Sequence, residues 1–278
     1  MPEEINRVLT DHISSILICP TEAAVGNLRR EGFTNILSDG KLCNAFDARC
    51  HKATDDIATS FVINVGDVMY DVLLYAVEIA TRRSNIMEQL QVSSKDYCLL
   101  TIHRAENTDD QERLKEVINF VNDVSSGTRI IFPVHPRAKK AFETMKIKFR
   151  DNVSSIEPLG YFDMVMLLKN SKCVLTDSGG IQKEAYWLKV PCITLRNETE
   201  WVETTQSGWN VLYKDYKGQH DLSDNNGRYY GDGKAAENII HVLNEWLSCK
   251  NPERRSQNAA KPQPKLTTPL SPPLQGGD

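Results

Sequence analysis

The fold is decided by residues 173–184, which read CVLTDSGGIQKE. The apolar run at 173–176 predicts a buried strand of a parallel sheet, and residues 181–188 predict a helix. Between them stand Ser178, Gly179 and Gly180. Two adjacent glycines permit left-handed backbone angles and the close approach of a ligand, since neither has a Cβ. The free N–H groups in the first turn of the helix, at the positive end of its dipole, then favour phosphate.

Glu184 lies one turn into this predicted helix, where its carboxylate can accept hydrogen bonds from the two hydroxyls of a ribose. A nucleotide site is one interpretation of the turn. The other is an ordinary strand–helix connection, because a glycine turn without a wider pattern is a weak signal. Motifs elsewhere in the chain are needed to distinguish these two interpretations.

The composition is that of an average globular protein. Of 278 residues, 40% are hydrophobic and 25% charged, with a formal net charge of −4, which suits one large domain or two ordinary ones. No basic cluster or stripe appears, so we expect neither nucleic acid nor an anionic membrane as a partner. No apolar run reaches the roughly 20 residues of a membrane span, and the start does not look like a signal peptide.

Cysteine usage points to a cytoplasmic protein. Of the seven cysteines, Cys19, Cys98, Cys173 and Cys192 lie in apolar, strand-like runs. The sequence has no CxxC pair and no His/Cys spacing typical of a metal site. We therefore expect free, reduced thiols.

Strands and helices alternate along the chain. Helices are predicted from residue 2 and at 21–30, 68–79, 111–124, 138–148, 162–169, 181–188 and 235–247, and strands at 15–19, 61–65, 97–102, 129–132, 154–156, 173–176 and 192–195. This alternation predicts a parallel sheet with helices on both faces, where ligands bind at the carboxyl ends of the strands. His103, His135, Ser178 and Arg196 each follow a predicted strand.

Three regions depart from the alternation. Residues 37–60 show no period and are interpreted as an inserted loop, and the polar residues 251–278 predict a disordered tail. The last predicted helix, at 235–247, is expected to have an apolar face formed by Ile239, Ile240, Leu243 and Trp246. The chain begins with a helix and a single strand, which suggests that the start of a domain is missing. We therefore expect residues 16–18 to form an unpaired sheet edge and the isolated chain to be poorly soluble.

Seven motifs occur in a fixed order: PEEINR at 2–7, GDVMYD at 66–71, TIHRAEN at 101–107, PVHP at 133–136, LTDSGGIQKE at 175–184, LRNETEWVE at 195–203 and GDGKA at 231–235. Together they resemble the non-hydrolysing UDP-N-acetylglucosamine 2-epimerases over about residues 1–250, apart from the insert. The combination is far more specific than the glycine turn alone.

The resemblance implies an α/β fold of the GT-B type, with two Rossmann-like domains built on parallel sheets. Residues 1–65 would be the incomplete N-terminal domain, with the insert at 37–60, and residues 66–234 the C-terminal, UDP-binding domain. Residues 235–250 would be a helix packing back toward the N-terminal domain, before the tail at 251–278.

The activity that the resemblance implies is the interconversion of UDP-N-acetylglucosamine and UDP-N-acetylmannosamine, which supplies precursors of cell-surface polysaccharides. UDP is eliminated to give a 2-acetamidoglucal and is then added back with the opposite configuration at C2. No cofactor or metal is implied. The step needs a base, an acid on the other face, and stabilisation of the departing diphosphate.

Site residues follow motif by motif from the resemblance. Ser178, Gly179 and Gly180 would hold the diphosphate, with Arg196 near it and Glu184 on the ribose. The catalytic residues would be Glu3, Arg7 and His103, the last assisting the leaving group. Tyr161 and Met164 would line the base pocket, and Arg104 and His135 would belong to a neighbouring regulatory UDP-sugar site.

Plainer interpretations stay open for several of these residues. His103 could cap the next helix, and Glu3 and Arg7 could form a solvated acidic helix start with a surface ion pair. The His-Pro pair at 135–136 could be a simple turn. Tyr161 and Met164 could be core residues.

The chain also departs from the family pattern. The family's first strand and two further catalytic carboxylates come before the PEEINR helix and have no counterpart here. Trp201 and Val202 stand where many bacterial members have arginine and proline. We therefore expect the chain alone to bind UDP weakly and to turn over little. A homodimer is implied by the family but depends on the absent part.

The sequence is also compatible with three other functions. A UDP-sugar-dependent GT-B glycosyltransferase would need an acceptor, which an epimerase does not. A hydrolysing epimerase would release free N-acetylmannosamine. A non-catalytic fragment would bind UDP without turnover.

Overall fold

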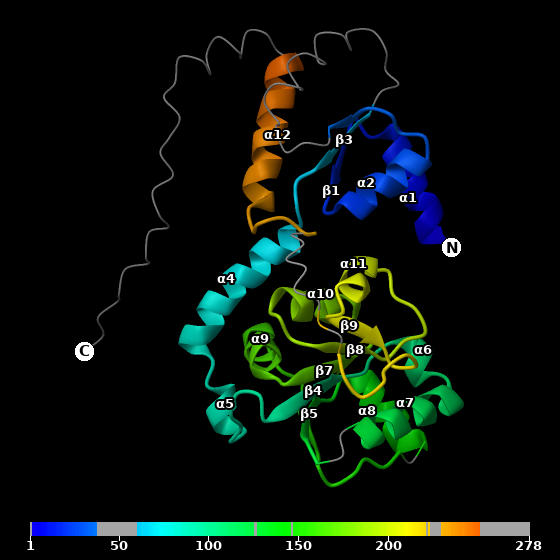
Figure 1. The fold of residues 1–278 in the computed structure, drawn as a ribbon, viewed down its shortest axis with the longest axis vertical. Coiled ribbons are helices and arrows are strands. Elements are labelled where there is room, and N and C mark those ends of the chain that lie inside the picture. The colour runs from blue at the N-terminus through cyan, green and yellow to red at the C-terminus, as the bar shows by residue number, and fades with distance from the viewer. Residues whose placement is uncertain are drawn as a thin grey trace, which may run out of the picture.

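The computed structural model describes residues 2–37, 60–124, 127–145, 147–220, 222 and 229–250, without the side chains at 2, 3, 136, 137, 140, 141, 249 and 250. The predicted insert, apart from its first and last residues, and the predicted tail lie outside the described residues. The described chain forms two separate parallel sheets, each covered by helices (Figure 1).

The smaller sheet contains β1 (Ile16–Cys19), β2 (Ile36–Leu37) and β3 (Phe61–Asn64) in the order β1-β3-β2, all parallel. It is preceded by α1 (Pro2–Ile13), and α2 (Glu22–Arg30) follows β1. Thr21 begins α2 because its Oγ1 accepts from the N–H of Ala24 at 3.1 Å. Leu37, predicted to start the insert, is instead the last residue of β2. Within the described residues β1 is an edge strand, as predicted.

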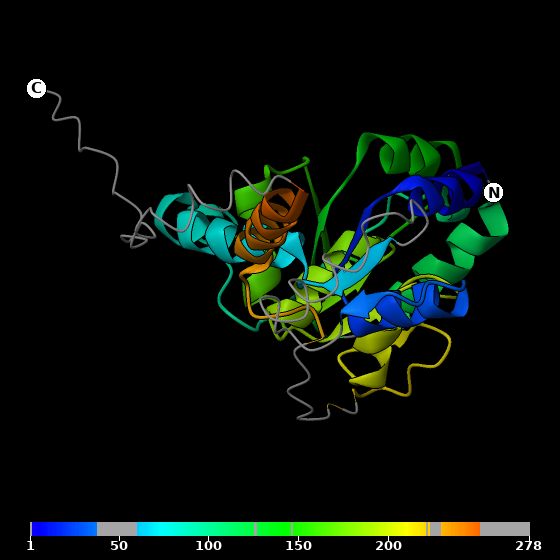
Figure 2. The same cartoon turned by 90° about the horizontal axis from the view of Figure 1, so that it is seen from above.

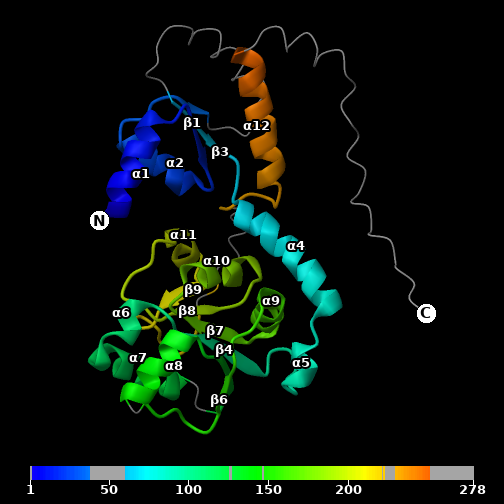
Figure 3. The same ribbon diagram turned by 180° about the vertical axis from the view of Figure 1, so that it is seen from behind.

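Side chains alternate between the two faces of this sheet, as strand geometry requires. Val62 of β3 packs with Leu17 and the α2 residues Val25 and Leu28 on one face. Phe61 and Ile63 face the other way, toward α12 (Ala235–Lys250). The last helix of the described chain therefore packs against the first sheet (Figure 3).

The predicted apolar face of α12 is partly wrong. Val242, with Ile239 and Trp246 packed beside it, covers the sheet. Ile240 is 59% exposed and Leu243 37% exposed. The buried stripe follows the spacing i, i+3, i+7, and the prediction took neighbouring residues that lie about 100° away from it.

The larger sheet contains β4 (Tyr97–Thr101), β5 (Arg129–Pro133), β6 (Val153–Ile156), β7 (Cys173–Thr176), β8 (Cys192–Thr194) and β9 (Asn210–Leu212). Its order is β6-β5-β4-β7-β8-β9, with every pair parallel. From β4 the chain winds outward to β6 and then returns to start β7 on the other side. The order therefore reverses between β4 and β7, and such a switch point is where doubly wound sheets bind ligands.

Helices cover both faces of this sheet, as predicted. The helices are α4 (Val68–Arg83), α5 (Ile86–Gln89), α6 (Ala105–Thr108), α7 (Gln111–Val124), α8 (Pro136–Met145), α9 (Tyr161–Asn170), α10 (Gly179–Trp187) and α11 (Val202–Gln206). Leu100 of β4 packs on the face of α7 and α8. Its neighbour Leu99 packs on the opposite face with residues of α9 and α10.

The two sheets are connected where β3 leads into α4 and where the chain returns into α12. Gly66 and Gly231, both at positive φ, touch there: a Cβ on Gly231 would lie 3.0 Å from Cα of Gly66. Asp71 of α4 accepts from the N–H groups of Ala235 and Ala236, which start α12. Seen from above, α4 and α12 lie together on the side of the molecule away from α1 (Figure 2).

Candidate functional site

The candidate site lies at the carboxyl ends of β4 and β7, the two strands of the switch point. Thr101 and Thr176 pair in register at these ends, and their buried hydroxyl oxygens are 2.6 Å apart. Residues 102–108 follow β4, and residues 177–180 follow β7. The motif residues quoted from these two loops are therefore neighbours in space, although they are about 75 positions apart in the sequence.

Asp177 is fully buried and joins the two loops. Its Oδ2 accepts from the backbone N–H of His103 at 3.0 Å and of Arg104 at 2.9 Å, and from Nδ2 of Asn107 at 3.1 Å. Burial alone would raise the pKa of Asp177, but the hydrogen bonds from His103 and Arg104 lower the pKa overall. The carboxylate therefore stays ionised and fixes the shape of the loop after β4.

His103 is oriented by the same carboxylate. Its Nδ1 lies 3.0 Å from Oδ1 of Asp177. An ionised carboxylate only accepts hydrogen bonds, so Nδ1 must carry the proton and Nε2 is left for another partner. The side chain of His103 is 40% exposed, whereas that of Asp177 is fully buried. This is the arrangement of a histidine held by a buried acid and open on its other side.

The turn after β7 differs from the prediction in one respect. Ser178 is the N-cap and α10 begins at Gly179, two residues earlier than expected. Neither Gly179 nor Gly180 is among the residues at positive φ, so the predicted left-handed angles are wrong. These glycines are the first helical residues, and their N–H groups have no acceptor within the helix. The missing Cβ of Gly179 does leave room for a close neighbour, but this neighbour is Glu200, whose Oε1 would lie 2.8 Å from a Cβ at that position, and the close approach of a ligand stays a prediction.

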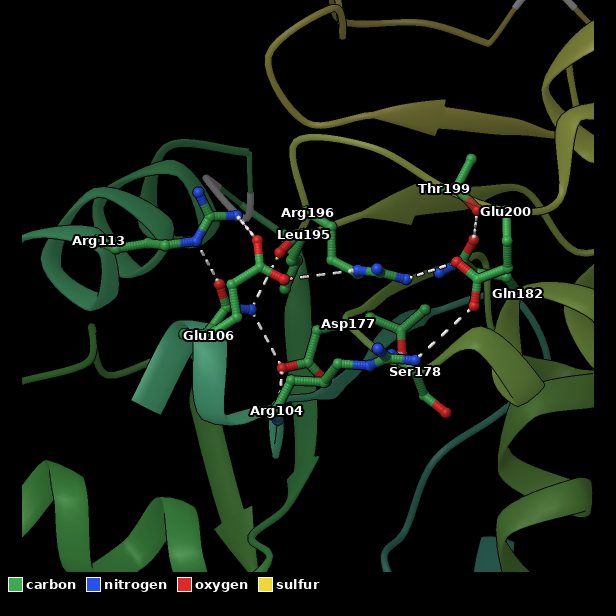
Figure 4. A network of polar contacts seen from close by, with 12 residues as sticks. Arg104, Glu106, Arg113, Asp177, Ser178, Gln182, Leu195, Arg196, Thr199 and Glu200 are labelled. Carbon is green, nitrogen blue, oxygen red and sulfur yellow. Dashed lines mark hydrogen bonds and ion pairs between the residues drawn. The ribbon is translucent and has the colours of Figure 1, made fainter. Parts of the chain in front are cut away.

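Charged side chains surround this helix start (Figure 4). Nη1 of Arg196 donates to Oε2 of Glu200 at 2.8 Å, and Nη2 of Arg104 lies 3.8 Å from Oε1 of the same carboxylate. On its other side Arg196 lies 3.8 Å from Glu106, which also pairs with Arg113 at 3.1 Å. Arg196 is only 8% exposed. A buried guanidinium held beside a helix N-terminus is suited to phosphate oxygens.

A small cavity opens on the other side of the turn. It has a volume of about 230 Å³ and is lined by Tyr161, Met164, Leu168, Ser178, Gly180, Ile181 and Glu184. The hydroxyl of Tyr161 donates to Oε1 of Glu184 at 2.9 Å. Burial raises the pKa of Glu184, and burial beside this carboxylate raises the pKa of Tyr161. The structure thus brings the predicted base-pocket and ribose residues together, and their roles stay predictions.

The predicted regulatory residues lie beside this site. The His135 ring is centred 6.0 Å from the His103 ring. Arg104 lies at the helix start itself, where its Nη2 would be 3.5 Å from a Cβ on Gly179. The two predicted sites therefore share a border.

Among the described residues, the ion pairs of Arg7, predicted to be catalytic, are made within α1 and with Glu31 and not with this cluster. Arg7 forms ion pairs with Glu4 at 2.8 Å, Asp11 at 2.7 Å and Glu31 at 2.8 Å, and these carboxylates raise its pKa. These ion pairs agree with the alternative interpretation of Arg7 as part of a surface ion pair at a solvated helix start. The side chain of Glu3 lies outside the described part of the structure.

Sequence reasoning did not assign roles to Asp177, Asn107, Glu106 or Glu200. All four stand inside motifs quoted for the resemblance. A signal was present, because an Asp directly after a buried strand and an Asn four residues after His103 are polar residues at the edge of a sheet. Each of them also has a partner or neighbour in another loop, however, and the spacing within one motif does not reveal such contacts.

Two further observations concern the part of the chain that the structure describes. This part contains no group of three or more His, Cys, Asp or Glu placed to hold a metal ion. No helix within it is both long and apolar enough to cross a membrane. The cysteines Cys19, Cys98, Cys173 and Cys192 are free thiols, as predicted.

The fold and the site define a class: an α/β protein with a doubly wound sheet and, at its switch point, a helix start suited to an anion, an arrangement typical of nucleotide-binding proteins. Comparison with known proteins narrows the class. The family model for UDP-N-acetylglucosamine 2-epimerase matches residues 1–244, and the chain belongs to this family.

Individual relatives agree with this assignment. A UDP-N-acetylglucosamine 2-epimerase homolog of Methanococcus maripaludis is 45% identical over 256 residues, with 87% of this chain and 64% of the relative covered. A UDP-2,3-diacetamido-2,3-dideoxy-D-glucuronate 2-epimerase of Pseudomonas aeruginosa is 38% identical over 254 residues, covering 87% of this chain and 63% of the relative. The chain thus spans somewhat less than two thirds of their length.

Solved structures give the same result. The Methanocaldococcus jannaschii UDP-GlcNAc 2-epimerase, solved in complex with UDP-GlcNAc and UDP, matches with a TM-score of 0.66 and 37% identity. The match covers 88% of this chain and 65% of that structure. The predicted GT-B-like α/β fold with parallel sheets is therefore confirmed, while the predicted domain boundaries stay predictions.

Proposed function

We propose that the chain binds the UDP part of a nucleotide sugar at the start of α10, and that its reaction interconverts UDP-N-acetylglucosamine and UDP-N-acetylmannosamine at C2. One observation carries the proposal. At the switch point, a helix N-terminus flanked by arginine has a carboxylate one turn further on and a histidine held by a buried acid across from it. These are the groups that a diphosphate, a ribose and a departing phosphate would need.

The geometry supports a binding role for each group. The N–H groups of Gly179 and Gly180 and the hydroxyl of Ser178 would take the diphosphate, because they lie at the positive end of the α10 dipole. Arg196 would add a fixed guanidinium to the same group. Glu184 would accept from the ribose hydroxyls, and Tyr161 would keep its carboxylate in place through the 2.9 Å hydrogen bond.

The catalytic role of His103 depends on Asp177. Elimination breaks the bond between C1 and the UDP oxygen, while a base takes the proton from C2. With Nδ1 donating to Asp177, a protonated Nε2 would donate a hydrogen bond to the leaving phosphate and stabilise its charge. Glu3 and Arg7 stay predictions as the acid–base group and its partner. A cytoplasmic location and a homodimer also stay predictions.

A second substrate is favoured by one finding. The Pseudomonas aeruginosa relative, at 38% identity, is named for a UDP-sugar with a second acetamido group and a carboxylate. The C2 chemistry is the same for both sugars, so the diphosphate and ribose contacts would not distinguish them. The substrate is therefore tested by offering both nucleotide sugars.

The test has two arms. Calorimetry with UDP measures binding, and proton NMR in D₂O follows each UDP-sugar with no acceptor present. Epimerisation would give the manno product and place deuterium at C2, whereas a glycosyltransferase would give neither and a hydrolysing enzyme would release the free sugar.

The outcomes separate the parts of the proposal. No binding of UDP at millimolar concentration would contradict the nucleotide site. Binding without manno product or C2 deuterium would contradict catalysis by residues 1–278 alone, and would agree with the sequence-based expectation of little turnover.

A further inference from the structure

Glu200 occupies a position that a nucleotide-binding site should keep for the ligand. Its Oε1 would lie 2.8 Å from a Cβ on Gly179, so the carboxylate lies directly against the first residue of α10. The N-terminus of a helix attracts any negative group, and here the nearest one belongs to the chain itself. The carboxylate therefore stands where the proposed function places phosphate oxygens.

The groups that hold Glu200 are the ones suited to phosphate. Nη1 of Arg196 donates to Oε2 at 2.8 Å, and Nη2 of Arg104 lies 3.8 Å from Oε1 (Figure 4). Two guanidinium groups thus converge on one carboxylate. A diphosphate carries more charge and more acceptor oxygens than a carboxylate, so it would satisfy this pair more fully.

One buried donor at this position, the indole N–H of Trp201, is not satisfied by Glu200. The indole Nε1 of Trp201 would be 3.1 Å from the same Cβ on Gly179. This N–H is buried and has no hydrogen-bond acceptor among the described residues. Lys183 lies 4.3 Å from the centre of the Trp201 ring, which helps to hold the indole in place. An unpartnered buried donor indicates that a further acceptor belongs here.

The Glu200 carboxylate also lies at the surface, where a ligand can displace it. The Glu200 side chain is 44% exposed, whereas that of Arg196 is only 10% exposed. Partial burial would raise the pKa of Glu200, but hydrogen bonds from its own backbone N–H and from Arg196, with the charge of Arg104, lower it overall. Glu200 is therefore an ionised group at the solvent boundary, and the arginine beneath it is fixed.

We propose that Glu200 is an internal anion that fills part of the diphosphate position, and that phosphate oxygens of the ligand replace its carboxylate on Arg196, Arg104 and the Trp201 indole. The inference rests on the proposed function. It makes Glu200 a determinant of affinity for the phosphate part of the ligand and leaves the nucleoside part unaffected.

The experiment compares Glu200→Gln with Glu198→Gln by calorimetry at fixed salt, with pyrophosphate, UDP and uridine as separate probes. Both substitutions remove one negative charge, and Glu198 is exposed two residues away. We expect Glu200→Gln to bind pyrophosphate and UDP about three- to tenfold more tightly than the unchanged chain. Uridine binding should change less than about twofold, and Glu198→Gln should leave all three constants within about twofold.

Other results would overturn the inference. Weaker binding by Glu200→Gln would mean that Glu200 positions Arg196 for the ligand, and equal binding would mean that it does not compete. Equal gains for both variants would show a general charge effect. If neither the unchanged chain nor Glu200→Gln bound UDP, the proposed nucleotide site would fail as well, whereas UDP binding without a gain would remove this inference alone.

Discussion

Two carboxylates at the edge of the larger sheet, Asp177 and Glu200, are held by positive groups but have different roles. Both have a pKa below the ordinary value, because hydrogen bonds and charge outweigh the effect of burial. Asp177 is fully buried and its bonds come largely from backbone N–H groups. Glu200 is nearly half exposed at its side chain and its side-chain partners are arginines.

The difference distinguishes a carboxylate that holds the backbone of the site in place from a carboxylate that a ligand can replace. A buried carboxylate that fixes backbone N–H groups cannot leave without exposing unpaired donors, which is costly. A carboxylate at the solvent boundary leaves at little cost, because water takes over its hydrogen bonds and a ligand takes over its arginines. Four substitutions test this distinction and the site around it, and Asp177 should show the greatest effect.

Asp177→Ala should cause the largest loss of stability, about 3–5 kcal/mol, because it leaves buried donors of His103, Arg104 and Asn107 without an acceptor. Urea unfolding measures it. The folded pKa of Asp177 lies below its unfolded value, so its stabilisation is complete above the unfolded pKa and is lost as the pH falls through the folded pKa. The difference between variant and unchanged chain should therefore shrink in acid.

Asp215→Ala is the control, since Asp215 is exposed and should change stability by less than about 0.5 kcal/mol. A loss below 1 kcal/mol for Asp177→Ala would show that the network around it is not structural.

Gly180→Ala should reduce UDP affinity by about tenfold or more without destabilising the chain. A Cβ on Gly180 has room, with Ser178 Oγ as its nearest neighbour at 3.9 Å, but it would face the approaching diphosphate. Calorimetry and thermal unfolding together check the prediction. Gly26→Ala in α2 is the matched control, because a Cβ there meets nothing within 4 Å. Unchanged UDP affinity would place the phosphate elsewhere.

Glu184→Gln should weaken UDP and uridine binding about three- to tenfold, because an amide oxygen accepts less strongly from the ribose hydroxyls. The same change should stabilise the unliganded chain at neutral pH. Burial raises the folded pKa of Glu184, so its ionised form costs stability above the folded pKa and the cost disappears below the unfolded pKa. The gain should therefore fade as the pH falls.

Tyr161→Phe removes the hydrogen bond to Glu184 but keeps the Glu184 carboxylate. It therefore separates the loss of this hydrogen bond from the effects of neutralising Glu184 on uridine binding and on stability. Uridine binding that is equal for Glu184→Gln and the unchanged chain would argue against a ribose contact.

Arg7→Ala should have the smallest effect on stability, at most about 1 kcal/mol, because its ion pairs with Glu4, Asp11 and Glu31 are exposed or partly exposed. The effect should decrease in 1 M salt, which denaturation curves at two salt concentrations would show. If Arg7 is catalytic, as the resemblance implies, turnover should fall while UDP affinity stays the same. A joint loss of both would assign it to binding.

Local signals explain how much the sequence predicts. The strand at 173–176 and the helix at 111–124 are found with the observed bounds, because an apolar run and a helical period are contained in the segment itself. The strand order is consistent with alternating strands and helices, and it places His103 beside Asp177. The family motifs supply the rest of the site residues.

Contacts between distant segments explain what the sequence does not predict. The start of α10 at Gly179 depends on the Ser178 cap, and the face of α12 depends on which residues of β3 it meets. The role of Asp177 depends on partners in the loop after β4, and that of Glu200 depends on Gly179 and Arg104 as well as on Arg196 of its own loop. Sequence spacing reports faces and periods, but not which charged side chain lies against which helix end.

The most direct test of the central claim is a crystal structure of the chain with UDP. The account predicts the diphosphate on the N–H groups of Gly179 and Gly180 and beside Arg196, the ribose hydroxyls on Glu184, and the Glu200 carboxylate moved away from Gly179. UDP bound at another place, with Glu200 still against Gly179 and the start of α10 without phosphate, would contradict it.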